Sequence, residues 1–216
     1  MTTASAARIL LTGFEPFGGD ATNPSITAAR AAAHQLRERG VAAEAVQLPC
    51  VFEQTQAVLR ETIDRLAPEV VIAVGLAGGT ARIEVERVAI NLQDARIPDN
   101  AGGQPVDVPV RAGGPAALFA TLPVKRCVDA VAGLGIPAAL SLTAGSFVCN
   151  HVMYQLLDEP GTARAAGFVH VPWDTENAPE GSAHLSLNDL SAALVAIAEA
   201  AADSAPDVVR PGGALH

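Results

Sequence analysis

The chain has 216 residues, of which 50% are hydrophobic and 17% are charged, and its formal net charge at pH 7 is −9. This length and apolar content are enough to fill the core of one α/β domain, and they exclude intrinsic disorder as a description of the whole chain. The acidic balance disfavours binding to nucleic acid or to anionic membrane surfaces, because both need clustered Lys or Arg side chains.

Apolar runs rich in β-branched residues alternate with longer helical patterns, which is typical of parallel strands joined by crossover helices. The expected strands are residues 9–12, 41–48, 70–74, 138–142 and 168–171. The expected helices are residues 25–39, 52–66, 124–134, 148–157 and a last one that Ser186 or Asn188 caps and that ends near Ala202. Residues 70–74 are apolar throughout, as in a central strand covered on both faces. The pattern predicts an α/β fold.

The longest irregular stretch is residues 91–115, and loops of this length in compact domains are usually functional. We treat residues 1–216 as a single domain and expect its ends, residues 1–7 and 205–216, to be frayed. No stretch approaches the ~20 apolar residues that span a bilayer, and the opening residues lack the features of a secretory signal. We therefore expect a cytoplasmic protein.

The first expected strand leads into the sequence TGFEPFGGD at residues 12–20, and open α/β sheets bind ligands at such strand ends. A phosphate-binding loop is one interpretation, but neither the Walker pattern nor GxGxxG is present and no lysine follows. Phe14 and Phe17 either fill the core or form an aromatic slot for a small, flat, uncharged group, with Pro16 fixing the chain between them. Both interpretations stay open from the sequence alone.

The three cysteines, Cys50, Cys127 and Cys149, include no CxxC pair, so we expect neither a disulfide framework nor a metal site. Cys149 follows an expected strand and a Gly turn, and if Ser146 caps the next helix, Cys149 lies in its first turn. There the helix dipole and free N–H groups favour a thiolate and can bind an oxyanion. Cys50 and Cys127 better fit buried structural cysteines.

A nucleophilic thiol needs a base, and His170 is a better candidate than His151. Two residues along a helix correspond to a rotation of about 200°, so His151 would point away from Cys149. His170 lies in a short apolar strand that ends at Pro172, where an imidazole has no solvation unless a partner supplies it. A satisfied core histidine is the alternative interpretation of His170.

A carboxylate is expected in residues 82–92, where the apolar side chains change phase around Glu86. A bulge or bend produces such a shift, and these features re-aim side chains beside active sites. Glu86 is therefore a stronger candidate than Glu84 for a third catalytic residue, with a solvated edge strand as the alternative. Asp94 and Asp99 in the following loop are the next candidates.

Several motifs together resemble those of the pyroglutamyl peptidase I family, the pyrrolidone-carboxylate peptidases, which are cysteine peptidases. The motifs are LTGFEPFGG with NPS, ERVAIN with DARIPDN, FVCNHVMY, and GFVHVP. The similarity runs from about Ile9 to Ala200. Leu76 and Leu142 depart from it, since many members carry Gln and Asn at these positions.

The resemblance implies a hydrolase that removes an N-terminal pyroglutamyl residue from peptides. It implies Cys149 as the nucleophile, His170 as its base and Glu86 as the third catalytic member. It further implies a three-layer α/β/α sandwich around a mostly parallel twisted sheet, no cofactor and no metal, and commonly a homotetramer.

The resemblance also implies a substrate pocket, because Phe14, Phe17 and Asn23 match positions that line the family's pyrrolidone pocket and Arg96 lies in a matching segment near the site. A pyroglutamyl group has no free amine, whereas an N-terminal Glu or Gln would bury an unpaired ammonium there. The expected partners are pyroglutamylated peptides. Two other hypotheses stay open, a thiol amidase acting on another cyclic amide and a non-catalytic nucleotide- or phosphate-binding module at residues 12–19.

Overall fold

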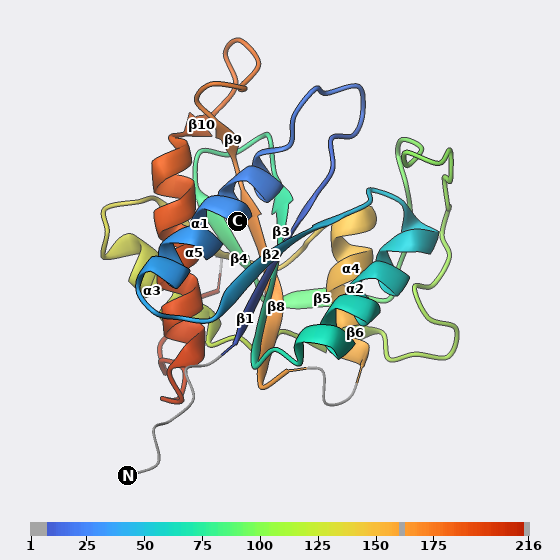
Figure 1. Cartoon of the computed structure of the whole chain (residues 1–216). Coiled ribbons are helices and arrows are strands. Elements are labelled where there is room, and N and C mark those ends of the chain that lie inside the picture. Colours follow the sequence, from blue (N-terminus) through green and yellow to red (C-terminus); the bar gives the residue numbers. More distant parts are fainter. Residues whose placement is uncertain (1–7, 160–162, 214–216) are drawn as a thin grey trace.

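The computed structural model describes residues 8–159 and 163–213 (Figure 1). Its main sheet has six strands in the order β2-β1-β3-β8-β4-β7. These strands are β1 (Ile9–Phe14), β2 (Ala43–Leu48), β3 (Val70–Leu76), β4 (Ile83–Glu86), β7 (Ala138–Ser141) and β8 (Ala165–Val171). Strands β2, β1, β3 and β8 are parallel, β4 is antiparallel to β8, and β7 is parallel to β4. The expected mostly parallel sheet is confirmed.

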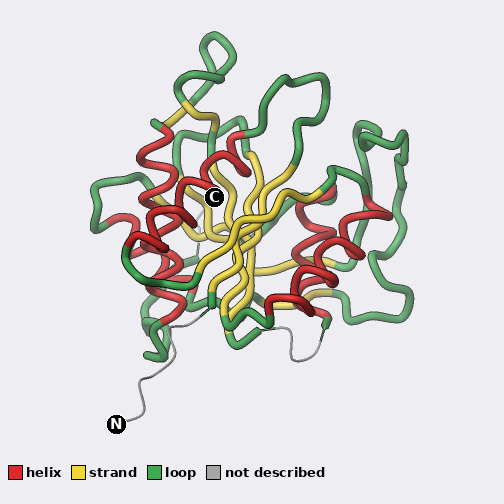
Figure 2. The backbone as a smooth tube through the Cα atoms, in the orientation of Figure 1, coloured by secondary structure: helices red, strands yellow, loops and turns green. Residues whose placement is uncertain are grey.

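Helices cover both faces of this sheet, and Figure 2 shows the strands between two groups of helices. On one face lie α1 (Pro24–Glu38), α3 (Val124–Ala132) and α5 (Leu187–Ala202). On the other face lie α2 (Phe52–Leu66) and α4 (Val148–Asp158). Helix α5 contacts both α1 and α3, and α2 contacts α4. The three-layer α/β/α sandwich is therefore confirmed.

Strand β3 shows why the apolar run is continuous. Residues Val70 to Val74 are all fully buried. Successive side chains of a strand point to opposite faces, so Val70, Ile72 and Val74 join the core under α1 and α5, whereas Val71 and Ala73 join the core under α2 and α4. A strand between two helical layers needs apolar residues at both parities.

The expected break in residues 82–92 lies at Arg87, between β4 and β5 (Val88–Ile90). The Arg87 N–H donates to the carbonyl of Ser141 in the main sheet, and the Arg87 carbonyl accepts from the N–H of Ala120. Strand β5 then pairs with β6 (Ala117–Phe119) in a separate antiparallel sheet. The phase change in the sequence therefore marks the point where the chain leaves the main sheet.

The remaining strands are short and were not expected from the sequence. They are β6, β9 (Trp173–Asp174) and β10 (His184–Leu185), and the last two pair in parallel. The stretch 91–115 is irregular as expected, apart from one antiparallel bridge between Gln93 and Val108.

The C-terminal segment differs from the expectation. Residues 205–213 are mostly exposed, but Asp207 is held in place at the start of α3. Its carboxylate accepts hydrogen bonds from the N–H groups of Arg126 (2.9 Å) and Lys125 (3.3 Å). Asp207 therefore anchors this segment to α3, where the sequence indicated frayed residues. Residues 1–7 and 214–216 lie outside the described part of the chain.

Candidate active site

The three expected catalytic side chains meet on one face of the main sheet. Glu86 is the last residue of β4, His170 lies near the end of β8, and Cys149 is the second residue of α4. Nδ1 of His170 lies 2.7 Å from Oε1 of Glu86. The Cys149 thiol also interacts with the His170 side chain and raises the pKa of this imidazole. Since Nδ1 faces the carboxylate, Nε2 is the ring nitrogen left for the thiol.

The antiparallel pairing of β4 with β8 explains why Glu86 has this position. Glu84 lies opposite His170 and Glu86 lies opposite Phe168, so all four side chains point to the face that α4 covers. Glu86 reaches His170 diagonally. Glu84 instead accepts hydrogen bonds at Oε1 from Nη2 (2.8 Å) and Nε (3.0 Å) of Arg82. The geometry thus favours Glu86 over Glu84 as the partner of His170.

Burial and charge act in opposite directions on His170, which is 7% exposed. Burial alone lowers the pKa of His170, but the hydrogen bonds and charges of Cys149 and Glu86 outweigh burial and raise this pKa to about 10. Glu86 itself is fully buried, and its second oxygen, Oε2, has no hydrogen-bond partner. A buried carboxylate so placed stabilises an imidazolium, because attraction between charges is screened little in the interior.

Gly75 of β3 makes room for the Cys149 thiol, and the sequence analysis missed it. Gly75 lies beside His170 in the sheet. A Cβ atom at this position would lie 2.8 Å from Cζ of Phe168 and 2.9 Å from Sγ of Cys149, closer than real contacts allow. The available signal was a glycine near the end of a buried apolar strand, which often marks the close approach of another group.

The start of α4 differs in one detail from the expectation. Ser146 does not cap the helix, because its hydroxyl donates to the carbonyl of Asp94 (2.8 Å). Phe147 occupies the N-cap position without a side-chain hydrogen bond. Cys149 nevertheless lies in the first turn, where the backbone N–H groups have no intrahelical acceptor. The helix dipole and these N–H groups favour negative charge near the thiol.

The other two cysteines have a different environment. Cys50 and Cys127 are buried, whereas Cys149 is half-buried. Burial raises the pKa of both Cys50 and Cys127 to about 12. These two residues are therefore structural, as expected. Within residues 8–159 and 163–213, no group of three or more His, Cys, Asp or Glu side chains could hold a metal ion.

Phe14 ends β1 and Phe17 lies in the loop that follows, and the two side chains have different environments. Phe14 is only 2% exposed, and its ring centroid lies 6.4 Å from that of Phe168 in the core. Phe17 is half-buried, with its ring centroid 6.1 Å from that of Phe147. Phe14 therefore supports the site from the core, whereas Phe17 and Phe147 form an accessible aromatic wall. Phe147 is a further residue that the sequence analysis did not single out.

Within the described residues, no hydrogen bond or ion pair joins Asn23 or Arg96 to Glu86, Cys149 or His170. Asn23 is buried and caps α1, since its Oδ1 accepts from N (3.0 Å) and Oγ (2.7 Å) of Ser25. Its Nδ2 donates to the carbonyl of Glu15 (3.0 Å), so its side chain is largely committed within the protein. Arg96 is exposed on the loop after β5.

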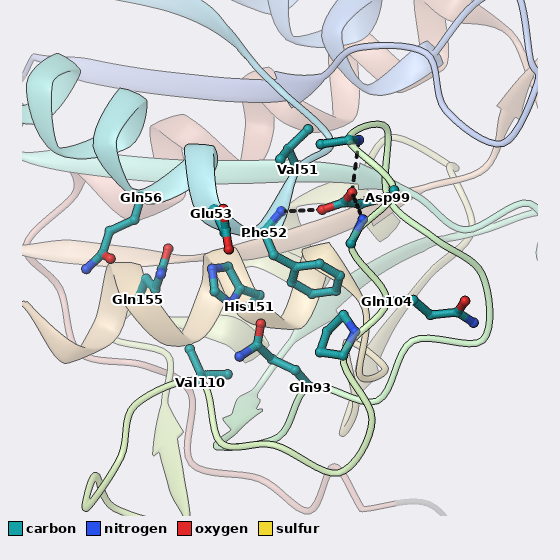
Figure 3. A pocket seen from close by; sticks show the side chains of 14 residues that line it. Val51, Phe52, Glu53, Gln56, Gln93, Asp99, Gln104, Val110, His151 and Gln155 are labelled. Carbon is teal, nitrogen blue, oxygen red and sulfur yellow. Dashed lines mark hydrogen bonds between the residues drawn. The ribbon is translucent and has the colours of Figure 1, made fainter.

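A cavity of about 720 Å³ lies beside the side of α4 that carries His151, and Figure 3 shows it from close by. His151 packs edge-to-face against Phe52 with ring centroids 5.4 Å apart, and burial lowers its pKa to about 4. Asp99 also lines this cavity, where its Oδ2 accepts from the N–H of Phe52 (2.9 Å). His151 thus points away from the thiol, as the helix rotation predicted, and Asp99 holds the start of α2.

Comparisons with known proteins agree with this geometry. The sequence model of the pyroglutamyl peptidase family matches residues 7–204. A pyrrolidone-carboxylate peptidase of Clavibacter michiganensis subsp. michiganensis is 48% identical, covering 96% of this chain and 98% of the relative. That of Chromobacterium violaceum is 50% identical, covering 96% of this chain and 99% of the relative.

Solved structures give the same result. Pyroglutamyl peptidase I from Bacillus amyloliquefaciens superposes with a TM-score of 0.88 at 43% identity, covering 95% of this chain and 100% of that chain. Pyrrolidone carboxyl peptidase from Thermococcus litoralis superposes with a TM-score of 0.86 at 33% identity, covering 95% of this chain and 99% of that chain. From its sequence match and its fold together, this chain belongs to the pyroglutamyl peptidase family.

Proposed function

We propose that this chain removes the N-terminal pyroglutamyl residue from peptides, with Cys149 as the nucleophile, His170 as the acid and base, and Glu86 as the residue that orients His170. Membership of the family makes the chain a hydrolase of the thiol-protease class and decides against a non-catalytic nucleotide- or phosphate-binding module. The observation that carries the residue roles is the 2.7 Å contact of His170 with Glu86, together with the interaction of Cys149 with the same imidazole, which raises its pKa.

The reaction begins when His170 takes the thiol proton of Cys149 and becomes an imidazolium, and the thiolate sulfur attacks the carbonyl carbon that joins the pyroglutamyl residue to the peptide. A C–S bond forms and the electron pair of the C=O bond moves onto oxygen, near the N–H groups at the start of α4. The His170 imidazolium then gives its proton to the leaving nitrogen and the C–N bond breaks. Water, deprotonated by His170, hydrolyses the thioester, which releases pyroglutamate and restores the thiol.

Glu86 has two effects in this proposal. Its carboxylate holds the Nδ1–H bond of His170, so Nε2 faces the sulfur and the leaving group. It also stabilises the imidazolium that exists before proton transfer. This supports the assignment of Glu86 as the third catalytic member.

The pyrrolidone ring needs apolar walls and a site without a carboxylate or ammonium partner. We assign this wall to Phe17, with Phe14 packed behind it. Asn23 and Arg96 remain proposed pocket residues, Asn23 through its hydrogen bond to the loop after β1 and Arg96 from the loop after β5. A thiol amidase for another cyclic amide would use the same wall. The names of the relatives support the pyroglutamyl substrate.

We also propose that residues 1–216 form one peptidase domain, which works in the cytoplasm as a homo-oligomer, a tetramer by its family resemblance. In the described ranges, 8–159 and 163–213, no helix has the length and apolar character needed to cross a membrane. Sedimentation velocity tests the assembly, and a monomer at working concentration would contradict it.

Hydrolysis of a pyroglutamyl-coumarin substrate tests the function directly, with the matching prolyl substrate as the control. We expect release from the first and not from the second, because the prolyl amine would be buried without a partner. Cys149→Ser should abolish this release while the fold stays intact, since a hydroxyl is a much poorer nucleophile beside His170. Undiminished activity of Cys149→Ser would contradict the assignment.

A further inference from the structure

Asn150, which follows Cys149 in the first turn of α4, is fully buried and joins this helix to β5. Its Oδ1 accepts from the N–H of Ile90 (2.9 Å). Its Nδ2 donates to the carbonyls of Ile90 (2.9 Å) and Leu92 (3.0 Å). The side-chain amide thus pairs with both backbone groups of Ile90, as a residue of a neighbouring strand would.

This contact links the segment that carries Glu86 to the helix that carries Cys149, and it does so outside the catalytic site itself. Strand β5 begins two residues after Glu86, and its other edge is fixed by the pairing with β6. Helix α4 carries Cys149. Asn150 therefore fixes the start of α4 against the chain segment that continues from Glu86.

The contact is directional and lies in the first turn of α4, whereas the directional contacts of Tyr154 with Pro115 and of Asp158 with Arg111 lie in later turns of the helix. Val148, Val152, Met153 and Leu156 attach α4 to the core through apolar contacts. Such contacts are non-directional, so they tolerate small shifts of a helix along its neighbours. Three hydrogen bonds, two to Ile90 at the end of β5 and one to Leu92 just after this strand, do not tolerate these shifts, because their strength falls steeply with distance and angle.

We propose that Asn150 is a positioning residue, which sets the approach of the Cys149 sulfur to the Glu86–His170 pair. Asn150 does not touch the reacting atoms and acts through the placement of α4. This inference rests on the proposed catalytic roles of Glu86, Cys149 and His170. On this proposal, loss of the Asn150 side chain lowers kcat and leaves KM nearly unchanged.

Asn91 offers a matched control. Its side chain also makes three hydrogen bonds to backbone groups, donating to the carbonyls of Arg111 (2.9 Å) and Gly114 (3.3 Å) and accepting from the N–H of Arg111 (2.9 Å). These bonds hold the loop after β5 and reach α4 only indirectly, because the Arg111 side chain pairs with Asp158 at the opposite end of the helix from Cys149. Asn150→Ala and Asn91→Ala therefore remove the same number of hydrogen bonds next to the same strand.

The first measurement compares kcat and KM of the two variants. We expect kcat of Asn150→Ala to fall about tenfold to a hundredfold with little change in KM, because small displacements of a reacting group cost this much. Asn91→Ala should keep a kcat near that of the wild type. Thermal unfolding curves verify that both variants are folded under the assay conditions.

The second measurement tests whether Asn150 acts through the catalytic series. If it does, the fold-loss in kcat of the double variant Asn150→Ala with Glu86→Gln is smaller than the product of the two separate fold-losses. The reason is that Asn150 aligns the thiol with the Glu86–His170 pair, and this alignment contributes less once the carboxylate is gone. The loss in Asn91→Ala combined with Glu86→Gln should equal the product. If Asn150 only stabilised the fold, the fold-losses in kcat would multiply in both double variants.

Asn150→Asp serves where Asn150→Ala is unstable, since the carboxylate fits the same volume and still accepts from the N–H of Ile90. A wild-type kcat in either folded variant, or multiplicative losses, would overturn the proposal. Failure of both variants to fold would also overturn it, because Asn150 would then be a stability residue. An active Cys149→Ser would refute the catalytic assignment itself, whereas an inactive Cys149→Ser with fully active Asn150 variants refutes positioning alone.

Discussion

Two buried histidines lie on opposite sides of α4 and have opposite acid–base properties. His170 is 7% exposed and His151 is 5% exposed, so burial is nearly the same. The pKa of His170 is raised to about 10, whereas that of His151 is lowered to about 4. His170 contacts Glu86 and Cys149, while His151 packs against the ring of Phe52. The charged partners, and not the depth of burial, decide which histidine can carry a proton at neutral pH.

The strongest test of this comparison replaces each histidine in turn. His170→Ala should abolish turnover of a pyroglutamyl-coumarin substrate, because the thiol loses its base and the leaving group its acid. His151→Ala should keep most of the activity, since His151 faces the cavity on the other side of α4. Steady-state kinetics on both variants checks this prediction. A larger loss in His151→Ala would mean that the catalytic side of α4 is assigned incorrectly.

The partner of His170 is tested next. Glu86→Gln keeps the shape and removes the charge, so we expect kcat to fall about tenfold to a thousandfold. Loss of the carboxylate also lowers the pKa of His170, so the imidazolium is lost at lower pH and the alkaline limb of the kcat/KM profile shifts to lower pH.

Glu84→Gln is the matched control for Glu86→Gln, since Glu84 lies on the same strand and face but pairs with Arg82. It should be nearly silent in both kcat and the pH profile. If Glu84→Gln is the damaged variant, the diagonal contact between β4 and β8 does not exist in solution.

Replacing Phe14 at the end of β1, or Phe17 in the loop after it, should have a smaller effect than replacing Glu86. Phe17→Ala should raise KM for pyroglutamyl substrates, because stripping one wall removes about 1–3 kcal/mol of ring burial. Phe14→Ala should instead lower the free energy of unfolding by about 3–5 kcal/mol, as expected for a core phenylalanine. Urea unfolding and KM values separate the two roles. A normal KM in folded Phe17→Ala would remove this side chain from the pocket.

The smallest effect concerns stability in acid. The pKa of His151 is lowered from 6.5 to about 4, so between these values the unfolded chain binds more protons than the folded chain. The free energy of unfolding should therefore fall as pH drops through this window. Urea unfolding at pH 7 and pH 5 should show a smaller loss in His151→Gln than in the wild type. His34→Gln, which changes an exposed histidine, should behave like the wild type.

The catalytic candidates were predictable because each left a local signal. Glu86 stands at a phase break, Cys149 follows a Gly turn, and His170 lies in an apolar strand. The helix rotation predicted that His151 faces away from Cys149, and His151 does face the cavity beside Phe52. Their assembly was not visible locally, since the diagonal contact of Glu86 with His170 depends on the register of β4 against β8, which are 84 residues apart at this point.

The remaining differences have non-local causes. Phe14 is a core residue because Phe168, from a distant strand, packs against it. Asp207 caps α3 from outside that helix, so the sequence around residues 205–213 gives no sign of an anchor. Asn23 is different, since Asn followed by Pro is a known pattern for the start of a helix and its capping role was available in the sequence.

Gly75 has a consequence for attempts to make this protein more robust. Strand propensity alone would favour a β-branched residue at this buried position, and replacing glycine usually stiffens the unfolded chain to the benefit of stability. Here any added side chain would displace the sulfur of Cys149 or the ring of Phe168. Thermostabilising designs that rank positions by backbone preference would select Gly75, and the added side chain would disturb both the Cys149 thiol and the packing of the buried Phe168 ring.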